Sequence, residues 1–218
     1  MVDPQQEIEP YLEAAAQKSM RITHVFETHV QADHLSGARR LAAVTGAPVF
    51  FHEAAPVDFP HATVADGEEH ELGNVRLTIL HTPGHTPESL SILVVDRTRG
   101  PEPWFVLTGD TLFSGGVGRP DLLGDGSETA AAEQLYESLH GRLLKLPDHI
   151  EVYPAHFGGA ACGKGLSGKP GSTIGFERRF NPALQLTSKA EFVRFVLADL
   201  PPQPPAFAEN RRRNLNGA

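Results

Sequence analysis

The stretch THVQADH, residues 28–34, places two histidines and an aspartate within six positions. These are His29, Asp33 and His34, and Gln31 stands where alternation would place a third imidazole. Imidazole nitrogens and carboxylate oxygens are ligands that proteins offer to zinc and iron. The stretch therefore predicts a metal site, and Gln31 raises the question of how many ions that site holds.

Three later stretches also bring a ligand-type residue to the end of an apolar run. They are HTPGHT (residues 81–86) with His85, LTGDTLF (107–113) with Asp110, and YPAH (153–156) with His156. A buried imidazole or carboxylate without a partner costs several kcal/mol through desolvation. We therefore expect these three residues and His29 to converge on one cation.

Composition narrows the class of protein. The chain has 218 residues, a formal net charge of −8 and one cysteine, Cys162. The negative charge argues against nucleic acid as a partner, and no apolar run approaches the roughly 20 residues of a membrane helix. One cysteine excludes an internal disulfide and a cysteine-rich zinc module, so nitrogen and oxygen ligands must hold any metal. No export signal is evident in the first residues, which predicts a cytoplasmic location.

Hydrophobic periodicity predicts alternating helices and strands. The expected helices cover residues 4–19, 36–46, 127–146 and 188–200, and the expected strands cover 21–28, 47–52, 75–82, 90–96, 104–110 and 150–156. Asp3 is the expected N-cap of the opening helix. We expect one domain over residues 1–200 and a Pro-rich, basic C-terminal tail over 201–218. A layered α/β fold with its chemistry along one sheet edge follows.

The number of ligands bears on the identity of the metal. Zinc hydrolases favour three histidines, or two ions bridged by a carboxylate, whereas two histidines and one carboxylate leave open positions on ferrous iron. In a two-zinc site the residue at position 31 would be a histidine, and a glutamine amide is a poor zinc ligand. Gln31 therefore weakens the two-zinc alternative without excluding it.

Together these motifs resemble those of the metallo-β-lactamase fold, and the resemblance runs over nearly the whole chain. The segments VDPQQEIEPYL (2–12), VGRPDL (117–122) and ACGKGLSGKPGSTIGFERRFNPALQ (161–185) add a resemblance to persulfide dioxygenases, in particular the bacterial subgroup often linked to rhodanese domains. The resemblance implies a four-layer αββα sandwich. The chain starts at the segment that follows the family's usual first strands, so we expect those strands to be lacking.

The resemblance also implies a ligand set. One Fe(II) per chain would be held by His29, His85 and Asp110, with Zn(II) as the alternative metal. The family's histidine at position 31 does not bind that iron. The residues that match Asp33, His34 and His156 line the pocket in the family, and we expect them to orient ligands and water by hydrogen bonds.

The activity implied is the oxidation of a thiol persulfide, glutathione persulfide or a similar compound, by O₂ to sulfite and thiol. The alternatives are a zinc-dependent, glyoxalase II-like hydrolase of hydroxyacylglutathione thioesters and a non-catalytic binding protein. Gly158 stands where glutathione-specific members have tyrosine, which makes glutathione persulfide less secure as the substrate. A rhodanese partner and a homo-oligomer are left open.

Two further residues are candidates for contact with the substrate, each with a structural alternative. Arg119 would either hold a substrate carboxylate or pair with Asp121. Cys162 would either carry a persulfide into the site or serve as a small buried apolar residue.

Overall fold

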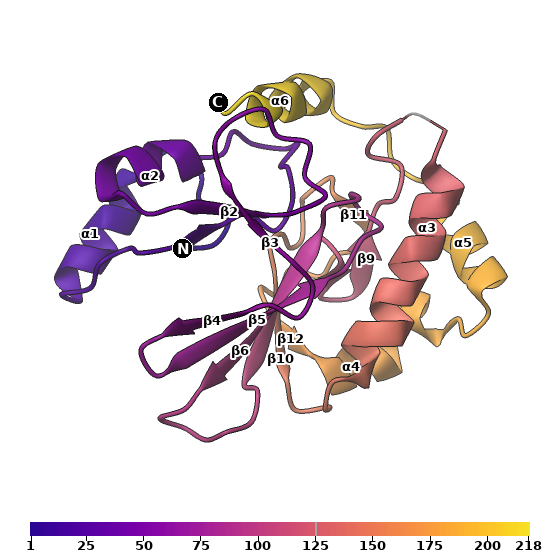
Figure 1. The fold of residues 1–218 in the computed structure, drawn as a ribbon. Coiled ribbons are helices and arrows are strands. Elements are labelled where there is room, and N and C mark those ends of the chain that lie inside the picture. The colour runs from indigo at the N-terminus through magenta and orange to yellow at the C-terminus, as the bar shows by residue number, and fades with distance from the viewer. Residues whose placement is uncertain (125) are drawn as a thin grey trace. The chain divides into compact units, whose positions relative to one another are not determined.

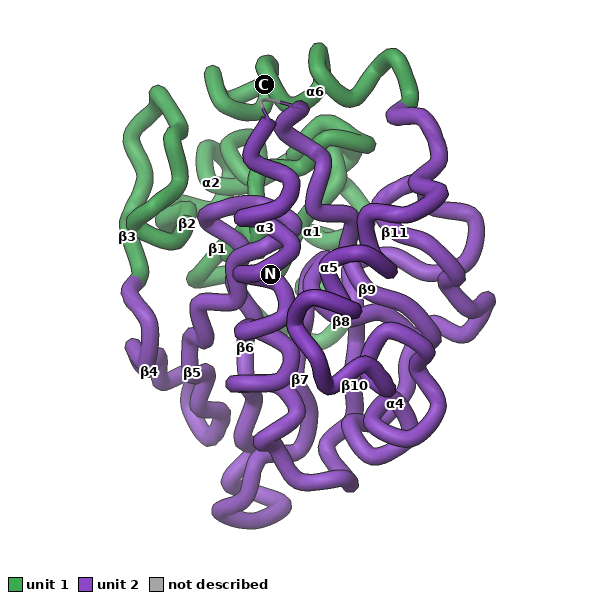
Figure 2. The backbone as a smooth tube through the Cα atoms, turned by 90° about the vertical axis from the view of Figure 1, so that its right-hand side faces the viewer, with its two compact units in different colours: residues 1–64, 204–218 green, residues 65–203 purple. Residues whose placement is uncertain are grey.

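The computed structural model describes residues 1–124 and 126–218. The chain forms two compact units, a smaller unit of residues 1–64 and 204–218 and a larger unit of residues 65–203 (Figure 2). The expected single domain over 1–200 stays a prediction. Among the described residues, no helix has both the length and the apolar character needed to cross a membrane.

The smaller unit is built on a parallel three-stranded sheet. Its strands are β1 (Val25–Phe26), β2 (Val49–His52) and β3 (Ala62–Val64), in that order, and its helices are α1 (Glu9–Gln17), α2 (Ala38–Thr45) and α6 (Ala206–Leu215) (Figure 1). Val25, Leu41 and Phe51 are buried in its core and join the sheet to α2. The strands are short and apolar, as expected for a sheet covered by helices.

Three expectations for the smaller unit need correction. The opening helix begins at Glu9, with Pro10 in its first turn, so Asp3 does not cap it. The strand expected over residues 21–28 is reduced to the two residues of β1. The segment expected to be a tail contains helix α6, where Phe207 is 4% exposed and belongs to the packed interior.

The larger unit contains a six-stranded mixed sheet. In spatial order its strands are β12 (Ser172–Thr173), β10 (Glu151–Pro154), β7 (Phe105–Gly109), β6 (Leu90–Asp96), β5 (Val75–His81) and β4 (Glu69–Leu72). The predicted strands at 75–82, 90–96, 104–110 and 150–156 are confirmed as β5, β6, β7 and β10. Because β7 and β10 are parallel neighbours, the residues after them emerge at the same edge of the sheet.

A second, three-stranded sheet in the larger unit has the order β11-β9-β8. Its strands are β8 (Leu112–Phe113), β9 (Gly116–Gly118) and β11 (Gly163–Lys164), and all of its pairs are antiparallel. The sequence did not predict these strands, because two- and three-residue strands rich in glycine carry no periodic signal. The strands β3 and β12 were missed for the same reason of length, and β4 was missed because its sequence, EHEL, contains only one apolar residue.

Helices cover one face of the six-stranded sheet. They are α3 (Glu128–Tyr136), α4 (Ile174–Phe180) and α5 (Lys189–Leu197), and α3 continues through a π-helical turn (Glu137–Arg142) and a 3-10 turn (Leu143–Lys145). Helices α3 and α5 lie side by side (Figure 1). Leu135, Phe192 and Val152 join the helices to the sheet in the main core, and each such buried side chain contributes about 1.5–3 kcal/mol. This packing fixes the sheet edge that carries the larger unit's polar motifs.

Candidate functional site

In the smaller unit, a chain of hydrogen bonds orients the His29 imidazole. The Thr28 hydroxyl donates to Asp3 Oδ2 at 2.9 Å, and the Thr28 amide donates to Asp3 Oδ1 at 2.7 Å. Because the hydroxyl's one proton is given to Asp3, its oxygen accepts from His29 Nδ1, 2.9 Å away. That bond places the imidazole proton on Nδ1, so that Nε2 is the nitrogen that carries the lone pair.

The rest of the THVQADH stretch forms a loop held by helix α6. Asn214 Nδ2 donates to the carbonyl oxygens of Gln31 at 2.8 Å and His34 at 2.9 Å, and its Oδ1 accepts from the Ser36 amide at 2.9 Å. Asn210 Nδ2 donates to the Ala32 carbonyl at 3.1 Å. Four backbone groups of residues 31–36 are therefore paired with side chains that lie 178–183 residues further along the chain.

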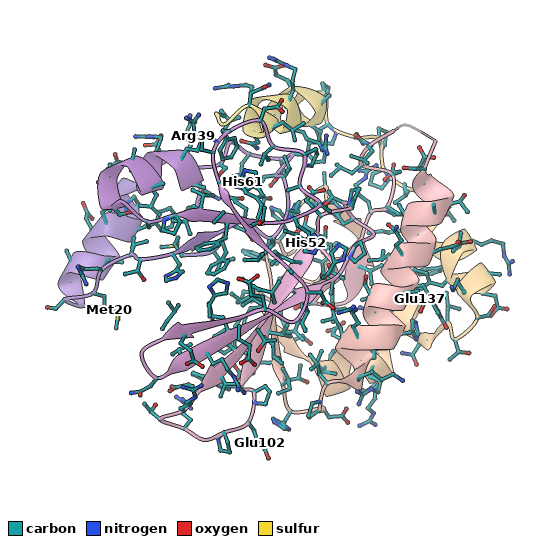
Figure 3. The ribbon with its side chains drawn as sticks, viewed as in Figure 1. Met20, Arg39, His52, His61, Glu102 and Glu137 are labelled. Atoms are coloured by element: carbon teal, nitrogen blue, oxygen red, sulfur yellow. The ribbon has the colours of Figure 1, made fainter. Side chains whose placement is uncertain are left out.

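A further link ties α2 to the C-terminal segment. Arg39, labelled in Figure 3, donates from Nη1 to the Gly217 carbonyl at 2.6 Å and stacks over the Phe59 ring with 5.2 Å to its centroid. The segment 206–217, which contains α6, therefore contacts both the motif loop and helix α2. A role in supporting the site follows for a segment that the sequence presents only as proline-rich and basic.

Beneath the loop lies a buried carboxyl, Glu27, 1% exposed. Burial raises the pKa of this carboxyl well above its usual value, the negative charge of Asp3 raises it further, and the hydrogen bond from Ser36 Oγ opposes both. Glu27 and Gln31 line a narrow cavity of the smaller unit. At the loop's far end, His34 Nδ1 donates to Asp33 Oδ1 at 3.0 Å.

In the larger unit, the HTPGHT loop is fixed against helix α3. Gly84 has φ of +139°, and a Cβ added there would lie 2.5 Å from the Leu135 backbone, so only glycine permits this approach. Ser138 Oγ donates to the Pro83 carbonyl at 2.7 Å. The loop then delivers His85, whose Nδ1 donates to the Arg119 carbonyl at 2.8 Å. His85 therefore keeps its proton on Nδ1 and its lone pair on Nε2.

Asp110 and His156 meet because β7 and β10 are parallel neighbours. The Ala155 amide donates to the Gly109 carbonyl at 3.0 Å, which brings the next residue of each strand alongside the other. His156 Nδ1 then donates to Asp110 Oδ1 at 2.6 Å. This bond orients the carboxylate, whose side chain is completely buried.

The second oxygen of Asp110 lies close to His85. Asp110 Oδ2 is 3.5 Å from His85 Nε2, and both side chains are at most 1% exposed. Two ligands about 2.1 Å from one ion lie roughly 3.0–3.5 Å from each other. The larger unit therefore contains a buried pair of electron-pair donors at the spacing that a shared cation needs.

Arg119 is engaged by the protein itself. Its guanidinium donates to both carboxylate oxygens of Asp121 at 2.8 Å, to the Ala161 carbonyl at 3.1 Å and to the Pro201 carbonyl at 2.8 Å. The side chain is 1% exposed. Burial alone would raise the pKa of Asp121, but the hydrogen bonds and charge of Arg119 hold that pKa below its usual value. These contacts favour the structural alternative over contact with a substrate.

Cys162 lies beside the Asp110–His156 pair. Its thiol sulfur and one ligand atom of each of these two residues are all within 4.8 Å of one another, and the cysteine is 2% exposed. Its carbonyl accepts from the Arg119 amide at 3.0 Å. A role as persulfide carrier stays a prediction.

The structure thus brings the predicted residues together within each unit. His29, Asp33 and His34 share the loop of the smaller unit, and His85, Asp110 and His156 share the sheet edge of the larger one. The convergence of His29 with His85 and Asp110 on one cation stays a prediction. Sequence reasoning missed the supporting groups, Asp3, Thr28, Ser138 and Asn214, although Asp3 lies within the VDPQQ segment that carries part of the family resemblance.

Comparison with known proteins gives a consistent family assignment. The family model described as metallo-beta-lactamase superfamily matches residues 2–156. A crystal structure of a metallo-beta-lactamase from Staphylococcus aureus aligns with a TM-score of 0.91 and 35% identity over 100% of this chain and 65% of that one. The present chain thus spans slightly less than two thirds of that protein.

Two curated relatives carry named activities. The mitochondrial persulfide dioxygenase ETHE1 of Bos taurus is 30% identical over 87% of this chain and 69% of its own length. The hydroxyacylglutathione hydrolase of Methylococcus capsulatus is 37% identical over 67% of this chain and 53% of its own length. These matches confirm the resemblance inferred from the motifs and leave two activities to be distinguished.

Proposed function

Because this chain belongs to the metallo-beta-lactamase superfamily and has its α/β fold, we propose that it is an iron-dependent persulfide dioxygenase. The observation that carries the proposal is Gln31, which stands where a two-zinc site requires a histidine. The identity to persulfide dioxygenase ETHE1 over 87% of the chain supports the same reading. The substrate class is a thiol persulfide, and the products are sulfite and thiol.

We assign the iron to His29, His85 and Asp110. The donor chemistry fits, since two neutral imidazoles and one carboxylate on one face are the ligand set of oxygen-using ferrous sites. The 3.5 Å separation of His85 Nε2 and Asp110 Oδ2 supports a shared cation in the larger unit. His29 enters the assignment through its place in the motif and its Nδ1 hydrogen bond. When bound, the iron supplies the redox chemistry with O₂.

The protein's own residues orient the ligands and balance charge. Thr28 and the Arg119 carbonyl each hold one imidazole by Nδ1, which directs Nε2 of that ring toward the cation. His156 holds one carboxylate oxygen of Asp110 and so leaves the other for the metal. Such supporting hydrogen bonds typically change metal affinity 10- to 100-fold.

The thiol carried by the persulfide is less narrowly assigned. A Cβ added at Gly158 would lie 3.0 Å from the Cα and nitrogen of Gly168, and the Gly158 amide donates to the Ser167 carbonyl at 2.7 Å. A tyrosine at position 158, as in glutathione-specific members, therefore requires the backbone at 167–168 to move. The proposal is accordingly made for thiol persulfides as a class.

The second candidate is a zinc-dependent thioesterase, favoured by the 37% identity to a hydroxyacylglutathione hydrolase. That identity covers 67% of this chain, less than the 87% covered by the dioxygenase relative. Hydrolysis by a two-zinc site would also need a metal ligand at position 31. A two-zinc hydrolase therefore requires position 31 to bind metal, whereas a one-iron dioxygenase requires no metal ligand there.

The test is an oxygen-electrode assay on protein purified without oxygen and loaded with ferrous iron. We expect O₂ uptake and sulfite formation with glutathione persulfide or another thiol persulfide, about one iron per chain, and no hydrolysis of a hydroxyacylglutathione thioester. Zinc at about two per chain without iron, or no O₂ uptake with any persulfide, would overturn the proposal. In a matched variant, Gln31→His, a gain of thioesterase activity that the parent lacks would show that position 31 separates the two chemistries.

A further inference from the structure

We propose that Glu177 and Asn181, which lie outside the predicted metal site, are positioning residues for His85. They hold the β8–β9 hairpin (residues 112–118), and the residue after the hairpin, Arg119, gives its carbonyl oxygen to the His85 ring. We call this pair the Glu177–Asn181 clamp. All of these residues belong to the larger unit. The role toward the metal rests on the proposed function, because it takes His85 as a ligand.

The clamp binds two consecutive backbone groups at the turn of the hairpin. Glu177 Oε2 accepts from the Gly115 amide at 2.9 Å and from Asn181 Nδ2 at 2.8 Å. Asn181 Nδ2 also donates to the Gly116 carbonyl at 3.0 Å. The other carboxyl oxygen, Glu177 Oε1, accepts from Ser172 Oγ at 2.5 Å. Glu177 and Asn181 are each 1% exposed, so a lost partner in this set leaves a buried polar group unpaired.

The clamp is anchored on helix α4. Glu177 lies in α4, and Asn181 both ends α4 and is the N-cap of the 3-10 helix Pro182–Gln185. As the N-cap, Asn181 Oδ1 accepts from the Ala183 amide at 3.2 Å. Ile174 at the start of α4 and Ala183 belong to the main core. The clamp therefore joins the hairpin to packed structure that does not depend on a cation.

The hairpin itself has few side chains with which to fix its position. Strand β9 is Gly-Val-Gly, and the turn before it contains Gly115, whose φ is +86°. Glycine loses more conformational freedom on folding than any other residue. A Cβ at Gly116 would lie 2.4 Å from the Lys164 carbonyl oxygen, so a larger residue does not fit there. Hydrogen bonds from outside the hairpin must therefore hold it, and the clamp and strand β11 provide them.

The far end of the hairpin lies against two predicted ligands. A Cβ at Gly118 would lie 1.9 Å from the Asp110 carbonyl oxygen and 3.2 Å from the His85 Cβ. The next residue is Arg119, whose carbonyl accepts from His85 Nδ1 at 2.8 Å. Because a carbonyl oxygen only accepts, this bond requires the proton on Nδ1. A hairpin displaced at Gly115 would move the acceptor that orients the His85 ring.

The test compares two substitutions at Glu177 in the full chain. Glu177→Leu removes both acceptor oxygens, so the Gly115 amide and Asn181 each lose a partner. Glu177→Gln keeps one oxygen for these two donors, and its amide nitrogen can donate to the Ser172 hydroxyl, which also accepts. The control is Phe192→Leu, which leaves a cavity in the same core and lowers stability without changing the clamp.

The first readout is the ¹⁵N chemical shifts of the His85 ring in the metal-free protein. We expect a protonated Nδ1 in the parent, a shifted Nδ1 signal in Glu177→Leu, and the parent signal in Glu177→Gln. The second readout is zinc affinity, measured against a competing chelator. It should fall at least about tenfold in Glu177→Leu and return to the parent value in Glu177→Gln. Phe192→Leu should change neither readout.

Unchanged His85 shifts or an unchanged zinc affinity in Glu177→Leu would overturn the proposal. Equal changes in Phe192→Leu would do the same, because they would show that lowered stability alone disturbs the site. If Glu177→Leu does not fold, Asn181→Ala takes its place with the same expectations, since it removes the bond to Gly116 and keeps the one between Glu177 and Gly115. Neither readout needs dioxygenase activity, so a parent without O₂ uptake would overturn the proposed function and leave this test intact.

Discussion

His156 Nδ1 lies 2.6 Å from Asp110 Oδ1, across the ends of two parallel strands. This bond holds one oxygen of a fully buried carboxylate and leaves the other 3.5 Å from His85 Nε2. His156 therefore acts on the candidate metal site through Asp110. We therefore expect His156 to raise the metal affinity of the site by fixing the orientation of the Asp110 carboxylate.

Replacing His156 by glutamine should lower the affinity for ferrous iron about 10- to 100-fold, because Asp110 loses the bond that orients it. Iron affinity is to be measured by anaerobic titration against a competing chelator. His149→Gln changes an exposed histidine of the same unit and should leave the affinity unchanged. An affinity in His156→Gln equal to that of the parent would show that Asp110 needs no such support.

Replacing Thr28 by valine should also weaken metal binding by about 10- to 100-fold. The change keeps the shape of the side chain but removes the hydroxyl that links Asp3 to His29 Nδ1, so the imidazole loses the bond that selects its tautomer. Thr23→Val, at an exposed position, is the matched control. The ¹⁵N chemical shifts of the His29 ring should report the altered tautomer. Unchanged shifts would show that the hydrogen bond from Thr28 does not select the tautomer of His29.

Replacing Asn214 by alanine should loosen the THVQADH loop. Its side chain makes two hydrogen bonds to that loop, at Gln31 and His34, and a third to the Ser36 amide just after it, and leaving a buried backbone group unpaired costs about 1–3 kcal/mol. We expect faster amide hydrogen exchange over residues 28–36 and a lower free energy of unfolding. Asn216→Ala removes a hydrogen bond within the C-terminal segment only, so it should leave exchange in the loop as it is in the parent.

Replacing Asp121 by asparagine should destabilise the protein in a pH-dependent way. The pKa of Asp121 is held below its usual value in the folded chain, so its ion pair with Arg119 stabilises the fold above the unfolded pKa of about 4. That contribution is lost as the pH falls through the folded pKa. Urea unfolding should therefore show a parent-to-variant difference that is full at neutral pH and disappears in acid. A difference that stays constant with pH would contradict an ionised Asp121.

Much of the fold could be predicted from periodicity. Strands β5, β6, β7 and β10 and the helix beginning near residue 128 follow from runs of four or more residues whose apolar side chains recur at the strand or helix period. Strands β8, β9 and β11 could not be predicted, because they exist through glycine-permitted close approaches, as at Gly118, and not through a pattern of their own. Helix α6 was missed because its charged sequence hides the two buried positions, Phe207 and Asn214.

The sequence by itself determined the ligand types, their order and the departure at Gln31, since these are matters of residue identity and spacing. Tertiary structure decided which nitrogen of His85 donates to the Arg119 carbonyl, which oxygen of Asp110 accepts from His156, and that the Arg119 guanidinium is bound by Asp121 and two carbonyls. Except for the Arg119–Asp121 pair, these hydrogen bonds join residues tens of positions apart in the sequence. A linear pattern names the groups that can bind a cation, but only packed strands and loops fix where their protons and lone pairs lie.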